Sequence, residues 1–364
     1  MAKAKKAILQ KKRTLGSGSS ERTASRQPFN VSEVSGRIPA APVPGFVAPM
    51  QAMLVDSIRP GEWIYEIKFD GYRAVALRGG NQTRILSRNE KDLGRKFPEV
   101  KDAVTALALQ DAVIDGEIVA LDDKGRSSFQ LLQGFDMGLV KPPIIFYAFD
   151  LLRLNGKDLQ NLPIEERKAK LEELLKKPPG VLRYSASFTK DIPELLDRAR
   201  TLGLEGLIGE RAGSRYDAGK RTGTWIKVKL HLEQEFIIGG YTEPEGSRKY
   251  FGALLVGFYE GKKLKFAGRV GTGFSEKLLS NLYSELNKIR VDKCPFFNLP
   301  ATGRNRWDQG LSAAEMKRCH WVKPVMVCQI KFTEWTRDDR LRQPVFLGIR
   351  EDKNPGEVVR EKIY

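Results

Sequence analysis

Residues 66–80 read EIKFDGYRAVALRGG and form part of the longer run WIYEIKFDGYRAVAL, residues 63–77. This run alternates and is rich in β-branched and aromatic residues, so it predicts a strand. Lys68 sits in its middle and is followed by Asp70 and Gly71. Lys68 is therefore either a solvent-facing lysine on an ordinary strand or a nucleophile at the floor of a pocket, and the rest of the chain has to decide.

The composition narrows the class of protein. The chain has 364 residues, enough for about two domains, and 41% of them are hydrophobic, enough for a core in each. Its formal net charge of +17 indicates a polyanionic partner, either nucleic acid or an acidic membrane surface. No apolar run is long enough to span a bilayer, and no signal-peptide pattern opens the chain, so we expect no membrane partner.

The cysteines point to a reducing compartment. Cys294, Cys319 and Cys328 form an odd and sparse set, which is not typical of a disulfide framework. The absence of a CxxC motif also argues against a structural zinc site.

The chain divides into three regions by amino-acid composition and by the pattern of apolar residues. Residues 1–45 are rich in Lys, Arg, Ser, Pro and Ala and predict a basic, disordered tail. Residues 46–230 mix strands and amphipathic helices without regular βαβ repetition, which predicts an α+β domain. Residues 231–364 contain five short glycine-punctuated strands and one helix, a pattern typical of a small OB-fold barrel.

Several short motifs supply parts that nucleotide chemistry would need. A lysine nucleophile attacking an α-phosphate needs cations for the phosphates, carboxylates for a divalent metal and a ring to stack the base. The candidate motifs are SRN at 87–89, DGE ending a strand at 115–117, FYAFDLL at 146–152, LEGLIGER at 204–211 and WIKVK at 225–229. In WIKVK, strand alternation places Lys227 and Lys229 on one face, where an anion between them would relieve their repulsion.

This ordered set resembles the covalent nucleotidyltransferase superfamily and, within it, the ATP-dependent DNA ligases. The segments at 266–274, FAGRVGTGF, and 321–353, ending in REDK, are similar to the ligase domain of bacterial end-joining ligases. The resemblance covers about residues 46 to 364. It implies an adenylation domain of antiparallel sheets and helices over 46–230, followed by an OB-fold domain over 231–364.

The resemblance also implies residue roles. Lys68 is expected to become adenylylated, Glu66 to read the adenine amino group, and Phe149 to stack on adenine. Lys227 and Lys229 are expected to hold the α-phosphate and share in catalysis. The remaining implied contacts are Arg73 and Arg88 near the ribose and phosphates, Glu117 and Glu205 at the ribose and Mg²⁺, and Arg350, Asp352 and Lys353 orienting pyrophosphate.

Individual alternatives stay open for some of these residues. An aromatic such as Phe149 in an apolar strand is commonly a core residue. Asp70 could be a turn residue, could orient Lys68, or could hold the strand exit. Glu210 stands where the family more often has a lysine, and Arg211 could keep a positive contact there.

The implied activity is the sealing of nicks in duplex DNA with ATP and Mg²⁺, or with Mn²⁺. We expect a monomer in the bacterial cytoplasm, at the nucleoid, acting in DNA break repair by non-homologous end joining with a Ku-type end-binding partner. The alternatives are an RNA ligase, an RNA capping guanylyltransferase, or a DNA-binding scaffold without catalysis. A hinge is expected near residues 229–235, because the barrel would have to approach and leave the cleft.

Overall fold

The computed structural model describes residues 42–299 and 311–362. Most of the predicted tail, residues 1–41, lies outside the described residues. The described residues belong to one compact unit, so the domain boundaries expected at 45/46 and 230/231 stay predictions. The second of them falls between two strands that are separated only by Leu230 and His231.

The first sheet carries the quoted stretch. Its strand order is β1-β11-β10-β2-β9, and all its pairs are antiparallel except β1 with β11. The helix α4, Ile192–Thr201, packs on β10. The strands are β1 Met53–Val55, β2 Trp63–Lys68, β9 Ser187–Phe188, β10 Gly206–Arg211 and β11 Trp225–Lys229.

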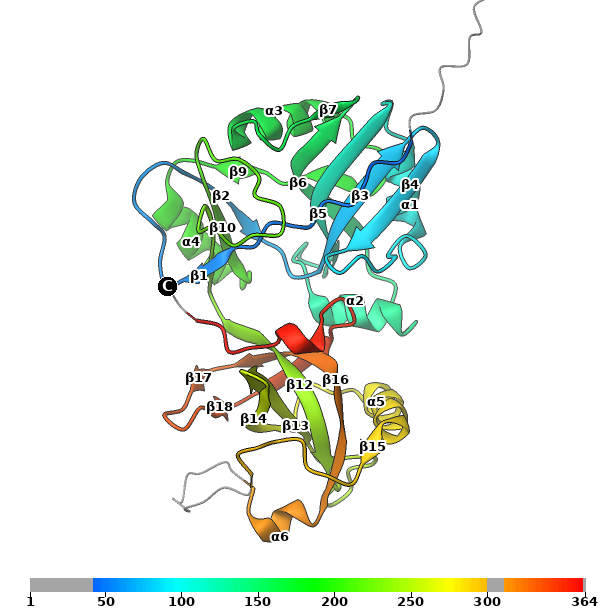
Figure 1. Ribbon diagram of the computed structural model, residues 1–364, viewed down its shortest axis with the longest axis vertical. Coiled ribbons are helices and arrows are strands. Elements are labelled where there is room, and N and C mark those ends of the chain that lie inside the picture. Colours follow the sequence, from blue (N-terminus) through cyan, green and yellow to red (C-terminus); the bar gives the residue numbers. More distant parts are fainter. Residues whose placement is uncertain (1–41, 300–310, 363–364) are drawn as a thin grey trace, which may run out of the picture. The chain divides into compact units, whose positions relative to one another are not determined.

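A second sheet runs in the order β4-β3-β5-β6-β7, and β8 pairs parallel to β6 (Figure 1). The helix α1 packs on β3 and β4, α2 on β5, and α3 on β6. The elements are β3 Tyr72–Gly79, β4 Gln82–Ser87, α1 Pro98–Thr105, β5 Asp111–Ala120, α2 Phe129–Asp136, β6 Ile144–Leu154, β7 Lys157–Asp158, α3 Ile164–Leu174 and β8 Leu182–Tyr184.

The prediction of one strand over 63–77 is wrong. The run breaks at residues 69–71 into β2 and β3, which belong to different sheets, so Lys68 ends a strand. The side chain of Asp70 accepts a hydrogen bond of 3.0 Å from the backbone N–H of Phe129, the first residue of α2. A Cβ on Gly71 would lie 2.2 Å from the carbonyl oxygen of Ile118, so only glycine fits this crossing. Asp70 therefore holds the strand exit.

The prediction that DGE ends a strand at a turn is also wrong. Asp115, Gly116 and Glu117 lie in the middle of β5. The strand register with β6 shifts between Asp115 and Gly116, and a Cβ on Gly116 would meet the Phe146 ring at 2.4 Å. The glycine marks a close approach of two strands, which a sequence pattern can easily mistake for a turn.

The third sheet contains two long neighbouring strands, β12 and β16, visible side by side in Figure 1. Its order is β14-β13-β12-β16-β15, and β19 also pairs with β16. Among the described residues, no ladder of hydrogen bonds joins β14 to β19. Strand pairing therefore does not run continuously around the barrel that is expected for an OB fold. The strands are β12 Leu232–Thr242, β13 Leu254–Glu260, β14 Lys263–Val270, β15 Arg290–Val291, β16 Cys319–Phe332 and β19 Val345–Ile349.

Short elements complete this region. The helix α5, Glu276–Lys288, begins where the Ser275 side chain accepts a hydrogen bond from the backbone N–H of Leu278. The remaining elements are the helix α6 Ala313–Met316, the strand pair β17 Glu334–Trp335 and β18 Leu341–Arg342, and the 3₁₀ turn η1 Pro355–Glu357.

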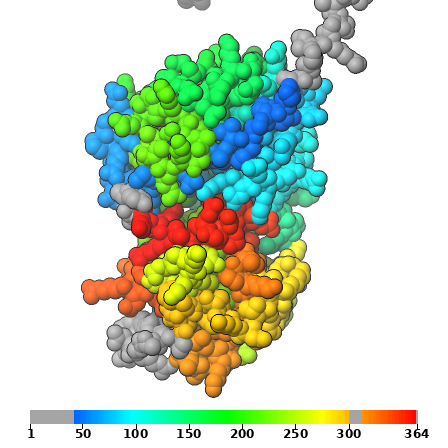
Figure 2. All heavy atoms as spheres, in the orientation of Figure 1, coloured from blue at the N-terminus to red at the C-terminus, as the bar shows by residue number. Residues whose placement is uncertain are grey.

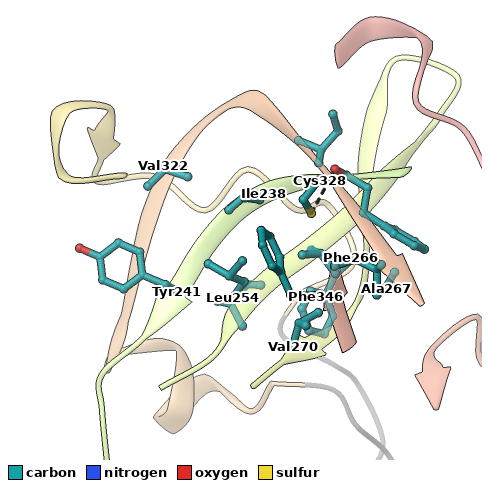
Figure 3. Packing of buried hydrophobic residues seen from close by; sticks show 14 of the residues in the cluster. Ile238, Tyr241, Leu254, Phe266, Ala267, Val270, Val322, Cys328 and Phe346 are labelled. Carbon is teal, nitrogen blue, oxygen red and sulfur yellow. Dashed lines mark hydrogen bonds between the residues drawn. The ribbon is translucent and has the colours of Figure 1, made fainter. Parts of the chain in front are cut away.

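A single apolar cluster fills the inside of the third sheet (Figure 3). Phe266 and Phe346 are fully buried there, and Cys328 donates a hydrogen bond to the carbonyl of Phe236 with a sulfur–oxygen distance of 3.5 Å. The three cysteines are free thiols. Each fully buried phenylalanine contributes about 1.5–3 kcal/mol by leaving water, so this core can stabilise the C-terminal region.

Candidate active site

Three adjacent strands align the predicted lysines. Gly206 of β10 lies opposite Lys68 of β2 on one side and opposite Lys229 of β11 on the other. Two residues further along β10, Ile208 lies opposite both Glu66 and Lys227. Gly206 has a positive φ, and a Cβ there would meet the carbonyl oxygen of Val228 at 2.0 Å. The glycine therefore leaves no side chain between Lys68 and Lys229.

A pocket opens over these strands. Eleven of the twelve residues predicted from the sequence to act in nucleotide or metal chemistry line it, whereas Asp352 is not among the lining residues. Residues 49–52, 67 and 69–71 line the pocket as well. The eleven predicted residues that line it are Glu66, Lys68, Arg73, Arg88, Glu117, Phe149, Glu205, Lys227, Lys229, Arg350 and Lys353.

Lys68 forms an ion pair with Glu205, which immediately precedes β10. Burial favours the neutral amine, but the charge and hydrogen bond of Glu205 outweigh burial and raise the pKa of Lys68 above its ordinary value. The lysine is therefore protonated in this state. The second carboxylate oxygen of Glu205, Oε2, is buried and has no hydrogen-bond partner among the described residues.

The second sheet contributes a cation, a carboxylate and a ring. Arg73 makes a bidentate pair with the fully buried Asp115, with both nitrogen–oxygen distances at 2.6 Å. Its guanidinium carbon also lies 4.5 Å from the centre of the Phe149 ring. Burial raises the pKa of Glu117 to about 7, although the charges of Arg73 and Lys68 oppose this shift.

Phe149 is only partly buried and faces the pocket, so it is not purely a core residue. Its ring packs edge-on against Trp225, with the ring centres 6.2 Å apart. Phe149 can therefore offer one ring face to a flat ligand while its edge is fixed by the protein.

The C-terminal region contributes further cations. Arg350 is buried in a bidentate pair with Asp352 at 2.8 and 2.9 Å, and Lys353 pairs with Glu235 at 2.8 Å. Arg88, just after β4, pairs with the exposed Glu357 at 3.3 Å. The basic residues predicted in REDK thus reach the same pocket as Lys68.

Two family models match the chain. The model described as ATP dependent DNA ligase domain matches residues 47–229, and the model described as ATP dependent DNA ligase C terminal region matches residues 247–353. The chain belongs to the ATP-dependent DNA ligase family. This membership favours DNA ligation over the RNA ligase, capping enzyme and scaffold alternatives, and it agrees with the α+β architecture followed by an OB-type region.

The relatives of this ligase include end-joining proteins. It is 40% identical over 326 residues to the multifunctional non-homologous end joining protein LigD of Pseudomonas aeruginosa, covering 88% of this chain and 37% of that protein. The LigD of Mycobacterium tuberculosis H37Rv is 37% identical, with 86% of this chain and 40% of that protein covered. The chain thus spans about two fifths of the length of these relatives.

A solved structure described as mycobacterial DNA ligase D complexed with ATP and MES has a similar fold. It is 33% identical to this ligase with a TM-score of 0.63, and the match covers 86% of this chain and 98% of that one. Within residues 42–299 and 311–362, no helix of this ligase is long and apolar enough to cross a membrane.

Glu361 is a pocket residue of the ligase that the sequence did not reveal. Its two carboxylate oxygens lie 2.6 Å from Nζ of Lys227 and 2.7 Å from Nζ of Lys229. It belongs to the C-terminal segment, part of which is visible in red in Figure 2. The anion expected between the two lysines is therefore a side chain of the ligase itself in this state. Nothing in the motif VVREKIY singles out this glutamate.

Lys168 is a second residue that was not predicted from the sequence. It forms ion pairs with Glu66 and with Glu210, the position where the family more often has a lysine. The cation beside Glu210 thus comes from α3, whereas Arg211 is exposed. One signal was available, because Ile164, Lys168 and Leu171 follow helical spacing and place Lys168 on the apolar face of α3.

Proposed function

We propose that this ligase seals nicks in duplex DNA with ATP through a covalent lysyl-AMP on Lys68. The observation that carries the proposal is the strand register that aligns Lys68 with Lys229, and Glu66 with Lys227, across β10 in one pocket. A nucleophilic amine beside two cations suits transfer at a phosphate, because such transfer depends on positioning and charge stabilisation.

The proposed first step joins Nζ of Lys68 to the α-phosphorus of ATP, and the bond from that phosphorus to pyrophosphate breaks. Lys227 and Lys229 offset the charge on the α-phosphate, while Arg350 and Lys353 orient the pyrophosphate. Glu361 has to leave the two lysines for a phosphate to take its place, because its oxygens occupy their ammonium groups.

The nucleoside is held by residues of both sheets in this proposal. Glu66 accepts a hydrogen bond from the adenine amino group, and Phe149 stacks on the base. Arg73 and Arg88 lie towards the ribose and phosphates, and Glu117 contacts the ribose region. Phe149 and Arg73 are already in contact, and Asp115 fixes the guanidinium beside the ring.

Mg²⁺ fits the carboxylates beside Lys68, and Mn²⁺ would suit the same oxygen donors. The buried, unpartnered Oε2 of Glu205 and the raised pKa of Glu117, about 7, both indicate carboxylates short of positive charge. Among the described residues no group of three His, Cys, Asp or Glu side chains could by itself hold a metal, so ATP phosphates and water would complete the shell. The ion would supply charge neutralisation at the phosphates.

Lys68 has to lose its proton before it attacks. The ion pair with Glu205 stabilises the protonated form of Lys68, which opposes attack. Withdrawal of Glu205 towards another cation would leave burial as the dominant influence, and burial favours the neutral amine. In this proposal the lysine becomes reactive only when Glu205 moves away from it, so Glu205 links nucleotide binding to activation of Lys68.

Two further phosphoryl transfers complete the reaction. The 5′-phosphate at the nick attacks the phosphorus of lysyl-AMP, which frees Lys68 and leaves AMP on the DNA end. The 3′-hydroxyl then attacks that end, the phosphodiester forms and AMP departs. The net charge of +17 suits the duplex, whose binding by phosphate neutralisation should weaken steeply with added salt.

The biological setting rests on the relatives. Both named relatives are end-joining proteins, which supports a role in bacterial DNA break repair. A Ku-type end-binding partner, a monomeric state and a location at the bacterial nucleoid are parts of the same proposal.

Sealing of a nicked duplex tests the function directly. Wild type with ATP and Mg²⁺ should seal a plain nick, and Lys68→Ala should not. On a nick already adenylylated at its 5′ end, Lys68→Ala should retain sealing, because the last step does not use the amine as nucleophile. Normal sealing of the plain nick by Lys68→Ala would overturn the proposal.

A further inference from the structure

A buried cluster of charges lies beside the proposed adenine site, and nothing in the mechanism above uses its central cation. Nζ of Lys168 pairs with Oε1 of Glu66 and lies 2.7 Å from Oε2 of Glu210. The Lys168 side chain is 4% exposed, and Glu66 and Glu210 are 4% and 1% exposed. Both glutamates line the pocket, whereas Lys168 stands behind them.

The same ammonium also fixes the backbone of Phe149. It donates a hydrogen bond of 3.0 Å to the Phe149 carbonyl oxygen. One cation on α3 therefore ties together Glu66, which would contact the edge of adenine, and Phe149, which would contact its face. A displacement of Lys168 would move both contacts at once.

The charges of this cluster do not balance if every group is ionised. Asp150 is neutralised by a bidentate pair with the fully buried Arg167, at 2.8 and 2.9 Å. The remaining two carboxylates, Glu66 and Glu210, share the single charge of Lys168. A buried carboxylate without a full counter-charge takes up a proton more readily.

The hydrogen bonds indicate which glutamate keeps its charge. Glu66 accepts from Lys168 and, at 2.6 Å, from the hydroxyl of the buried Ser185. Oε2 of Glu210 has no hydrogen bond of acceptable geometry among the described residues, although Lys168 is near. Burial raises the pKa of both glutamates, that of Glu210 to about 8, and Lys168 opposes the shift in each; at Glu66 the Ser185 hydroxyl opposes it as well. The extra proton therefore belongs on Glu210.

We propose that Lys168 is the positioning residue that sets the base specificity of this ligase, by keeping Glu66 an ionised hydrogen-bond acceptor aimed at the purine 6-position. The inference rests on the proposed function, since it needs a nucleotide bound over Glu66. An ionised Glu66 accepts from the 6-amino group of adenine and repels the 6-oxo group of guanine. A protonated Glu66 could donate to that oxygen instead.

The test measures covalent transfer to Lys68 from three nucleotides: ATP, GTP and purine riboside triphosphate, which lacks the 6-amino group. Mass spectrometry of the protein follows the adduct with time. Lys168→Met should raise the apparent KM for ATP about tenfold with a smaller change in kcat, because ground-state contacts to the base are lost. Its preference for ATP over the purine analogue should fall at least about tenfold, and its rejection of GTP should relax.

Matched variants separate specificity from folding. Lys170→Met, an exposed lysine of the same helix, should behave as wild type. Lys168→Arg should retain most of the preference for ATP because the positive charge stays. Glu210→Gln added to Lys168→Met should restore part of it, because it removes the competing carboxylate. Ser185→Ala removes a weaker donor to Glu66 and should lower the preference for ATP over the purine analogue about threefold. This variant replaces Lys168→Met in the test if Lys168→Met does not fold.

The outcomes distinguish this inference from the proposed function. If wild type forms no adduct on Lys68, the proposed function fails and the inference with it. The other outcome is that wild type forms the adduct and folded Lys168→Met keeps the wild-type preference among the three nucleotides. That result, or the same result with Ser185→Ala in its place, would overturn only the role of Lys168.

Discussion

At the scale of single residues, Lys68 is held in a form that does not react. An amine attacks phosphorus only when it is neutral, and the ion pair with Glu205 raises the pKa of Lys68. Nearby, burial and the charge of Lys229 lower the pKa of Lys227 to about 8, although Glu361 opposes this shift. Internal carboxylates thus pair with the lysines in places where the proposed mechanism needs phosphates.

Glu361 should compete with ATP. Because its carboxylate occupies both Lys227 and Lys229, Glu361→Gln removes an internal anion that a phosphate would otherwise have to displace. We expect the apparent KM for ATP in adduct formation on Lys68 to fall about fivefold, the equivalent of about 1 kcal/mol. Initial rates at a series of ATP concentrations measure the change.

The control for that variant is Glu334→Gln. Glu334 forms an exposed ion pair with Arg342, away from the lysines of the pocket, so its loss should leave the KM for ATP unchanged. An unchanged or higher KM for ATP in Glu361→Gln would show that the carboxylate does not compete with the nucleotide.

At the scale of elements, α3 is anchored by a charge that water does not reach. Arg167 and Asp150 are both fully buried, and Arg167 also donates to the carbonyls of Leu162 and Ser214 at 2.6 and 3.0 Å. Arg167→Met leaves Asp150 buried without its counter-ion, so the free energy of unfolding should fall by about 3–5 kcal/mol. Chemical denaturation measures it.

An exposed pair of the same kind gives the comparison. Arg198 and Glu194 on α4 are four residues apart and 73% and 60% exposed. Arg198→Met should therefore change the free energy of unfolding by less than about 0.5 kcal/mol. Equal effects of the two substitutions would mean that the Arg167 pair is not an anchor of α3.

Local patterns predicted strands and amphipathic helices but not where each strand stops. The predicted motif FYAFDLL at 146–152 lies inside β6, and DGE at 115–117 lies inside β5. The run at 63–77 divides because Asp70 and Gly71 lie against residues 47 or more positions away. Such contacts leave no periodic trace in the sequence.

The residues of the candidate site were also predictable only in part. Strand alternation placed Lys227 and Lys229 on one face, and both contact Glu361. Glu361 itself lies 134 and 132 positions from these lysines, so no spacing rule could pair them. Lys168 could have been found from its place on the apolar face of α3, but its partners Glu66 and Glu210 could not.

At the scale of the whole molecule, stability should depend on pH in an unusual direction. Burial raises the pKa of Glu117 to about 7 and those of Glu210 and Glu233 to about 8, above an ordinary value of 4.5. Between these values the folded state binds more protons than the unfolded state, so the free energy of unfolding falls as pH rises. From pH 6.5 to 8 we expect a fall of about 1–3 kcal/mol, measured by denaturant unfolding.

Other groups limit the window for this prediction. Burial lowers the pKa values of His231 and His320, which act in the opposite direction below pH 6.5, and the lowered pKa of Lys227, about 8, does so above pH 8. Glu233→Gln should make the dependence between pH 6.5 and 8 shallower. A free energy of unfolding that rises with pH in this window would contradict the assignment of protons to these buried carboxyl groups.

The central claim is that adenylate becomes covalently attached to Lys68 before DNA is involved. Incubation of the purified protein with ATP and Mg²⁺, followed by peptide mass spectrometry, tests it most directly. The account predicts one AMP on the peptide that contains Lys68, and none on that peptide when position 68 is alanine. An unmodified Lys68 peptide from folded protein, or AMP carried by a different residue, would contradict the account.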